Sequence, residues 1–246
     1  MRSASGRATY PDVAGAQGRG PHPVGERTGP ARARVSGSVR SRNVAERFIA
    51  VAGNIGVGKT TLVRFLTEHY GIKPVFEPFE DNPYLDDYYR DMKAWGFHSQ
   101  VWFLAHKFRL HREFQADSGT LIQDRTIYED AEIFATYLHR SKRMSDRDFQ
   151  TYQELYSAMR ASLQPPDLMI YLRCSVRAIR RRVKQRGRPS EQNIPAPYLR
   201  SLNALYEDWM EGWDASPKIV WDTEKADYLE DWVDRVELQR AVEAVL

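Results

Sequence analysis

Residues 53–60 read GNIGVGKT, and this stretch decides the fold. It matches the pattern G-x-x-x-x-G-K-[ST] and overlaps the end of residues 47–53 (RFIAVAG), a β-branched apolar run typical of a buried strand. Residues 59–70 place apolar side chains at helical spacing, and Gly71 is a stop signal. Strand, glycine loop and helix in this order are the context in which the pattern forms a phosphate-binding P-loop, which disfavours a chance glycine turn.

The loop residues have separate expected roles in binding ATP and Mg²⁺. Glycines let the backbone wrap phosphates with its N–H groups pointing inward, at the positive end of the following helix. Lys59 is expected to reach the β- and γ-phosphates, Thr60 to bind Mg²⁺, and Thr61 to donate to a phosphate oxygen. The predicted cofactor-binding residues of the loop are Gly53, Asn54, Ile55, Gly56, Val57, Gly58, Lys59, Thr60 and Thr61.

The remaining apolar runs predict the fold class. Short runs at residues 74–76, 121–122, 168–172 and 218–221 alternate with long helical patterns. Strands that alternate with helices indicate an α/β protein with a parallel sheet covered on both faces.

Composition separates a basic tail from one folded domain. Residues 1–45 are rich in Gly, Pro, Ser, Ala and Arg and nearly lack large apolar side chains, so we expect a disordered basic tail. A transit peptide or a start codon placed too far upstream are alternatives. Residues 46–246 are expected to form the single domain. Nine arginines in residues 1–47 account for the positive net charge, so nucleic-acid binding by the domain is not expected.

Cysteine count and hydropathy bear on location. The single cysteine, Cys174, excludes an intrachain disulfide and a cysteine-based zinc cluster, which fits a reducing compartment. No stretch approaches the roughly 20 uninterrupted apolar residues of a membrane-spanning helix. We therefore expect a cytoplasmic protein without a membrane partner.

Two carboxylates follow predicted strands on the side where a parallel sheet binds ligands. These are Glu77 and Asp124, and Arg125 comes directly after Asp124. Phosphoryl transfer needs a group that orients or deprotonates the acceptor hydroxyl and a carboxylate near the metal, so all three are candidate catalytic residues. Taken singly, either carboxylate could equally be a solvated turn or a helix cap.

A basic segment follows the fourth predicted strand. Residues 173–188 contain eight basic residues and no acidic one. On a helix, Arg182 and Arg186 stack at i, i+4, and Arg188 lies just past a break at Gly187. We expect these three arginines to bind ATP phosphates as part of a lid. The alternative is a solvated basic helix or a nucleic-acid patch.

The motifs, in order and spacing, resemble the deoxyribonucleoside kinase family over residues 48–213. The matching stretches are GNIGVGKTT (53–61), FEPFEDNPYL (76–85), WGFHSQVWFLAHKF (95–108), QDRTIYEDAEIFA (123–135) and RGRPSEQNIPAPYL (186–199). The chain is most similar to bacterial deoxyadenosine and deoxycytidine kinases, in which the Asp-Arg pair is usual. The resemblance implies a P-loop kinase fold with a five-stranded parallel sheet and an arginine-rich lid.

The resemblance also implies a substrate site. Glu77 and Arg125 would lie at the 5′-hydroxyl, and Tyr89 and Glu191 would hold the 3′-hydroxyl. Gln100 and Asp130 would read the base. Independently, Gln100 lies in an apolar helical run, where a buried amide needs partners and suits a base edge, although a core glutamine bonded to backbone is the alternative.

The sequence departs from the family pattern in places that bear on base recognition and the lid. Thr126 replaces the usual serine, and Lys107 stands where some members have arginine. Pro189 and Ser190 replace more polar lid residues. The aromatics Trp95, Phe97 and Trp102 are core residues by pattern, whereas the family uses rings in this region to stack on the base.

We therefore expect ATP- and Mg²⁺-dependent phosphorylation of a deoxyribonucleoside 5′-hydroxyl, in nucleotide salvage and by a homodimer. Deoxyadenosine is the expected substrate, with deoxycytidine and deoxyguanosine as further candidates. Glu77 is the first choice of base and Asp124 the second, with Thr60 and Asp124 at the metal. The alternatives are a nucleoside monophosphate kinase of thymidylate kinase type, disfavoured by the acidic stretch EDNPYLDDYY (80–89), and a nucleic-acid-binding P-loop ATPase.

Overall fold

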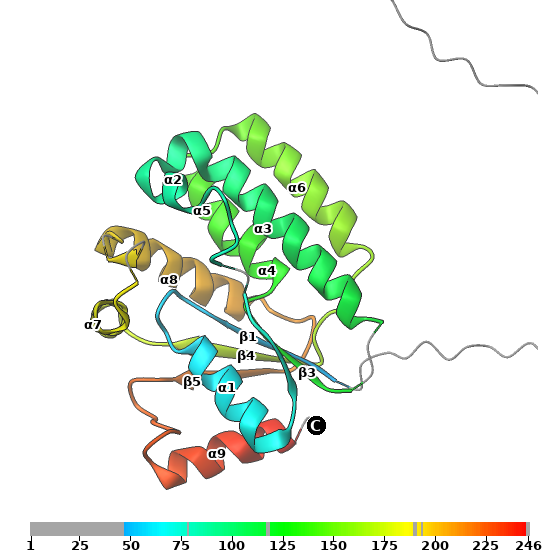
Figure 1. Cartoon of the computed structure of the whole chain (residues 1–246), viewed down its shortest axis with the longest axis vertical. Coiled ribbons are helices and arrows are strands. Elements are labelled where there is room, and N and C mark those ends of the chain that lie inside the picture. The colour runs from blue at the N-terminus through cyan, green and yellow to red at the C-terminus, as the bar shows by residue number, and fades with distance from the viewer. Residues whose placement is uncertain (1–46, 78, 117–118, 189–190, 193, 245–246) are drawn as a thin grey trace, which may run out of the picture. The chain divides into compact units, whose positions relative to one another are not determined.

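A parallel five-stranded sheet forms the centre of the described chain (Figure 1). The computed structural model describes residues 47–77, 79–116, 119–188, 191–192 and 194–244, so the expected tail at residues 1–45 lies outside it. The spatial order is β2-β3-β1-β4-β5. The strands are β1 (Phe48–Gly53), β2 (Lys73–Val75), β3 (Leu121–Asp124), β4 (Leu168–Arg173) and β5 (Lys218–Asp222).

The register of the strands brings the predicted site residues to one edge of the sheet. Val51 in β1 pairs with Asp124 in β3 and with Ile170 in β4. Gly53, where the P-loop begins, pairs with Leu172. Because the strand order reverses at β1, the carboxyl ends of β1 and β3 flank the position where such sheets bind ligands.

Helices cover both faces of the sheet (Figure 1). In Figure 1, α1 and α9 lie together on one face, and α3, α8 and the segment from α4 to α5 lie on the other. The helices are α1 (Lys59–Tyr70), α2 (Leu85–Arg90), α3 (Met92–Phe114), α4 (Ile127–Glu129), η1 (Asp130–Ala135), α5 (Thr136–Arg140), α6 (Asp146–Arg160), α7 (Val176–Arg186), α8 (Ala196–Glu211) and α9 (Trp232–Glu243).

Local sequence signals account for most of these boundaries. The α1 helix has the predicted bounds, and Gly71 ends it in the left-handed conformation at φ 66°. The Ser145 hydroxyl caps α6 by accepting from the backbone N–H of Asp148. All residues of β1 are buried, as expected for a central parallel strand.

One segment was not predicted. Between α4 and α5 the chain forms a π-helix, η1, which is uncommon and concentrated at functional sites. The Thr136 hydroxyl donates to the carbonyl oxygen of Ala131 at 2.9 Å across this segment. The π-helix begins at Asp130, one of the predicted substrate residues.

Two expectations from the sequence, on Cys174 and on membrane-spanning helices, concern features outside the site. Cys174 is buried and free, so the structure gives it a packing role. None of the helices in the described ranges is long and apolar enough to cross a membrane.

We predict that His111 makes folding stability depend on pH. The buried ring donates Nε2–H to the carbonyl oxygen of Gln164 at 3.0 Å and meets Phe48 edge-on. Burial lowers the pKa of His111 from 6.5 to about 4. Between these values the unfolded state binds the extra proton, so the free energy of unfolding should fall as pH drops, by up to about 1.4 kcal/mol per pH unit.

Urea unfolding of the wild type and of His111→Gln at pH 7.0, 5.5 and 4.5 measures this effect. The variant keeps an N–H donor for Gln164 but has no ring to protonate. The wild type should lose more stability than the variant below about pH 6.5. Parallel losses in the two proteins would contradict the prediction.

Candidate active site

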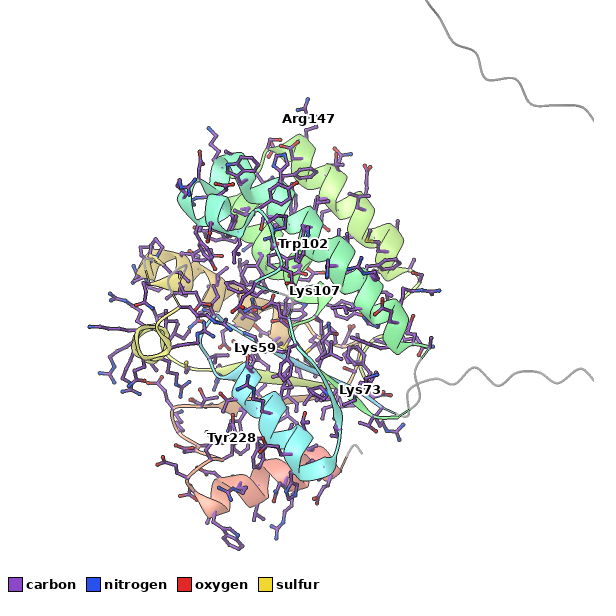
Figure 2. The ribbon with its side chains drawn as sticks, viewed as in Figure 1. Lys59, Lys73, Trp102, Lys107, Arg147 and Tyr228 are labelled. Carbon is purple, nitrogen blue, oxygen red and sulfur yellow. The ribbon has the colours of Figure 1, made fainter. Side chains whose placement is uncertain are left out.

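The phosphate loop is closed on itself by the side chain of Lys59. Its Nζ donates to the carbonyl oxygens of Gly53 at 2.8 Å and Asn54 at 3.1 Å. Burial, and secondarily the charge of Arg125, lower the pKa of Lys59 to about 8. In Figure 2, Lys59 lies at the start of α1 and Lys107 lies on α3.

At two loop positions a side chain would clash with a neighbouring element. Gly53 has φ 145°, and a Cβ there would lie 2.5 Å from the carbonyl oxygen of Leu172. Gly56 has φ 74°, and a Cβ there would lie 2.7 Å from a methyl group of Val183 in α7. The loop therefore packs directly against both β4 and the lid helix.

Asn54 anchors the loop to α8. Its amide nitrogen donates to the carbonyl oxygen of Leu199 at 3.0 Å and to the side-chain oxygen of Asn203, while its own side-chain oxygen accepts from the N–H of Ile55 at 2.8 Å. The Asn54 side chain is thus committed to the protein, and only its backbone is available to a phosphate.

Thr60 and Asp124 form a donor set that suits Mg²⁺ shared with phosphates. The Thr60 hydroxyl donates to Asp124 Oδ2 at 2.5 Å. Asp124 Oδ1 is buried and has no hydrogen-bond partner among the described residues. The described part of the chain contains no group of three or more His, Cys, Asp or Glu side chains that could hold a metal ion. Mg²⁺ is usually bound by one or two protein oxygens together with phosphates and water.

A buried network of charges joins Glu77, Arg125, Lys107 and Asp130. Arg125 Nη1 lies 3.1 Å from one Glu77 oxygen and 3.3 Å from the other. Lys107 Nζ donates to Glu77 at 3.0 Å and to Asp130 at 2.7 Å. The structure therefore brings together four residues from three separate segments of the sequence.

The network perturbs the pKa values of both carboxylates, in opposite directions. Burial alone would raise the pKa of Glu77, but the charges of Arg125, Lys107 and Lys59 outweigh it and lower the pKa to about 2. For Asp130, burial outweighs Lys107 and raises the pKa to about 7. Glu77 is thus ionised throughout the physiological range.

The expected nucleoside residues line the same cavity as the phosphate loop. The cavity has a volume of about 910 Å³. Gln100 is 2% exposed, and its Oε1 has no partner in the described part of the chain, nor does Asp130 Oδ2. Burial raises the pKa of Tyr89 well above its usual value, so its hydroxyl stays protonated and able to donate. The cavity wall also contains Glu191.

The rings in the cavity differ from those singled out in the sequence. Phe79, Tyr88, Phe103 and Phe134 line it. Trp102 stacks on His106 at 4.3 Å between ring centroids, and Trp95 stacks on Tyr84 at 5.8 Å. Helical periodicity alone could not separate these rings, because all of those on α3 lie within one long apolar pattern.

All three predicted lid arginines line the cavity, with different partners. Arg182 donates to the carbonyl oxygen of Val57 at 2.9 Å and to both oxygens of Thr223. Arg186 pairs with Glu191. Arg188 lies 3.6 Å from Glu191 and 3.9 Å from Glu80. The sequence departures at residues 189–190 lie outside the described residues.

Sequence reasoning did not single out two buried residues as members of the site. Lys107 appeared only as a departure from the family pattern, yet it is the cation shared by Glu77 and Asp130. Glu129 was not predicted, although the spacing Thr126-x-x-Glu129 is a capping-box signal. In the structure the Glu129 side chain accepts from the N–H of Thr126, as it would in such a box.

Comparison with known proteins identifies the family. The sequence model of the deoxynucleoside kinases matches residues 49–246. The chain belongs to the deoxynucleoside kinase family. The predicted family, the P-loop kinase fold and the five-stranded parallel sheet are confirmed.

The relatives of this deoxynucleoside kinase are named for nucleosides that carry different bases. It is 39% identical over 187 residues to deoxyadenosine/deoxycytidine kinase of Bacillus subtilis, covering 75% of this chain and 86% of the relative. It is 36% identical to deoxyadenosine kinase of Dictyostelium discoideum, covering 72% of each. The solved deoxyadenosine kinase of M. mycoides with bound dATP is 28% identical with a TM-score of 0.71, over 80% of this chain and 99% of that one.

We predict that Lys107 stabilises the folded kinase by compensating the negative charge of the buried Glu77 and Asp130. Lys107→Met would leave Glu77 and Asp130 buried with less positive charge and should lower the free energy of unfolding by about 3–5 kcal/mol. Adding Asp130→Asn should restore part of that loss. Denaturant unfolding measures both, with Lys93→Met as the control, because Lys93 is exposed on the same helix. Equal stability of Lys107→Met and Lys93→Met would contradict the prediction.

Proposed function

We propose that this deoxynucleoside kinase transfers the γ-phosphoryl group of ATP to the 5′-hydroxyl of deoxyadenosine, with deoxycytidine and deoxyguanosine as further substrates. The observation that carries the proposal is the position of the Arg125–Glu77 ion pair. It lies in one cavity with the phosphate loop and with the partly unpaired polar groups of Gln100 and Asp130. A donor site and an acceptor site would thus meet at this pair.

The donor phosphates would be held by backbone N–H groups of the phosphate loop, by Lys59, and by Arg182, Arg186 and Arg188. The N–H of Gly53 is not one of these groups, because it donates to Glu129. Positioning and electrostatic stabilisation supply most of the catalysis in phosphoryl transfer, so a cluster of fixed cations at the loop suits the reaction. Thr60 and Asp124 would hold Mg²⁺, which when bound would neutralise phosphate charge.

Glu77 would accept the hydrogen bond of the 5′-hydroxyl and hold it in line for transfer. A pKa of about 2 makes Glu77 a weak base but keeps it an acceptor at every physiological pH. In a loose transition state the proton leaves late, so orientation of the hydroxyl matters more than basicity. Asp124 is the second choice, because it already accepts from Thr60. Arg125 would bind the transferring phosphoryl oxygens beside Glu77.

The base would be read by Gln100 and Asp130, and the 3′-hydroxyl by Tyr89 and Glu191. An amide matches adenine through one donor and one acceptor, and cytosine also presents an amino group beside a ring nitrogen. The relatives named for deoxyadenosine and deoxycytidine support this choice. A homodimer and a cytoplasmic role in nucleotide salvage stay predictions.

The substrate assignment predicts a defined order of activities. With ATP and Mg²⁺, phosphorylation of deoxyadenosine should be the fastest by kcat/KM, followed by deoxycytidine and deoxyguanosine, with little transfer to thymidine or dTMP. A coupled assay of ADP formation, checked by chromatography of the monophosphate product, measures this. A preference for thymidine or dTMP would refute the proposal.

Replacement of Glu77 tests its assigned role. Glu77→Gln should lower kcat by about 10² or more, because the amide no longer accepts the hydroxyl with full charge, while KM for deoxyadenosine changes little. The matched control is Glu68→Gln, an exposed glutamate on α1. A change confined to KM would show that Glu77 only binds the nucleoside.

A further inference from the structure

One fully buried carboxylate beneath the phosphate loop is not used by the proposed reaction. Glu129 is 0% exposed, at the end of α4. Its Oε1 accepts from the N–H of Gly53 at 3.2 Å and from the hydroxyl of Tyr206 at 2.7 Å. Its Oε2 accepts from the N–H of Thr126 at 2.9 Å. These three hydrogen bonds come from β1, α8 and the residue that follows Arg125.

Glu129 also forms an ion pair with Arg125, through a different guanidinium nitrogen from the one that pairs with Glu77. Arg125 Nε lies 3.7 Å from Glu129 Oε1, whereas Arg125 Nη1 lies 3.1 Å from Glu77 Oε2. Arg125 has φ 62°, in the left-handed region that a long side chain rarely adopts, so neighbouring contacts must hold it there. The guanidinium therefore lies between two carboxylates, only one of which faces the proposed acceptor site.

The N–H and the carbonyl group of Gly53 both bond to charged side chains of the site. Glu129 accepts from the Gly53 N–H. The Gly53 carbonyl oxygen accepts from Arg125 Nη2 at 3.4 Å and from Lys59 Nζ at 2.8 Å. The first residue of the phosphate loop is thus tied to the arginine of the acceptor site through Glu129 on one side and directly on the other.

Burial of a charged carboxylate is costly unless donors surround it. Glu129 accepts from two backbone N–H groups and one hydroxyl and forms an ion pair with the Arg125 guanidinium, and these contacts fix its orientation. They offset only part of the cost of burial, which raises the pKa of Glu129. It does not line the cavity, so it has no direct contact with a bound nucleotide.

We propose that Glu129 is a positioning residue that sets the geometry between Arg125 and the phosphate loop. The hydroxyl of Tyr206 in α8 holds the Glu129 carboxylate in place by donating to it. The proposal rests on the roles assigned above to Arg125 and to the loop. Glu129 acts through the Gly53 N–H on the donor side and through Arg125 on the acceptor side. Among the described residues its side chain bonds to Gly53, Thr126, Tyr206 and Arg125 and not to the side chains of Gln100 or Asp130, so we expect recognition of the base to be independent of it.

Replacement by glutamine tests the positioning role with little change in volume. Both Glu129 oxygens accept from backbone N–H groups, so an amide must turn its NH₂ against either Gly53 or Thr126. Glu129→Gln should lower kcat at least ten-fold and weaken ATP binding at least three-fold, with the affinity for deoxyadenosine changed less than two-fold. Glu129→Asp, which keeps the charge and both acceptor oxygens, should recover part of kcat.

Tyr206 supplies a second test that leaves the carboxylate in place. Tyr206→Phe should lower kcat less than Glu129→Gln does, and the double variant should be no slower than Glu129→Gln alone, because Tyr206 acts through Glu129. The matched controls are Tyr156→Phe and Glu132→Gln, a Tyr–Glu pair joined at 3.4 Å that does not line the cavity. Both controls should keep wild-type kinetics.

Two measurements on the full chain test the proposal. Steady-state kinetics gives kcat, and calorimetry below the melting temperature of each variant gives the affinities for ATP and for deoxyadenosine. The proposal is overturned if Glu129→Gln lowers only the melting temperature, or if the two affinities fall equally. Absence of activity in the wild type would refute the proposed function instead. The ATP affinities of the wild type and Glu129→Gln would then decide the Glu129 proposal, with equal affinities overturning it.

Discussion

The buried guanidinium of Arg125, held between the carboxylates of Glu77 and Glu129, is the interaction on which the rest of the site depends. A charge in this position is stable only because carboxylates flank it. Those carboxylates in turn need Lys107 and the backbone donors beneath the loop. The site is therefore one electrostatic unit, in which removal of any member leaves an opposite charge with one partner fewer.

The lid extends this unit toward the solvent. Arg186 and Arg188 both pair with Glu191, the residue proposed to bind the 3′-hydroxyl. Arg182 instead bonds to Val57 and Thr223, which joins the lid helix to the loop and to the end of β5. Cations assigned to the phosphates thus share a partner with the nucleoside side, and the two halves of the cavity are electrostatically connected before any substrate binds.

Local patterns in the sequence predicted the P-loop, α1 with its Gly71 end, the parallel sheet and the basic lid, because each depends on residues close together along the chain. The family resemblance added Tyr89, Gln100, Asp130 and Glu191, which the structure places in one cavity. The role of Lys107 between Glu77 and Asp130 depends on contacts across 30 and 23 positions of sequence. No local pattern encodes such contacts, and the same holds for the contact of Glu129 with Tyr206.

The π-helix at Asp130 makes residue count, as well as residue type, a determinant of the site. A π turn contains one residue more than an α turn, and each residue of an α-helix rotates the chain by about 100°. The wider turn therefore accommodates its extra residue without rotating α4 against α5. A further residue inserted between Asp130 and Ala135, or a return of this segment to regular α-helix with every residue kept, would rotate the two helices and change the direction of Asp130 relative to Lys107. Such a change therefore counts as an active-site mutation, even when every polar side chain is kept.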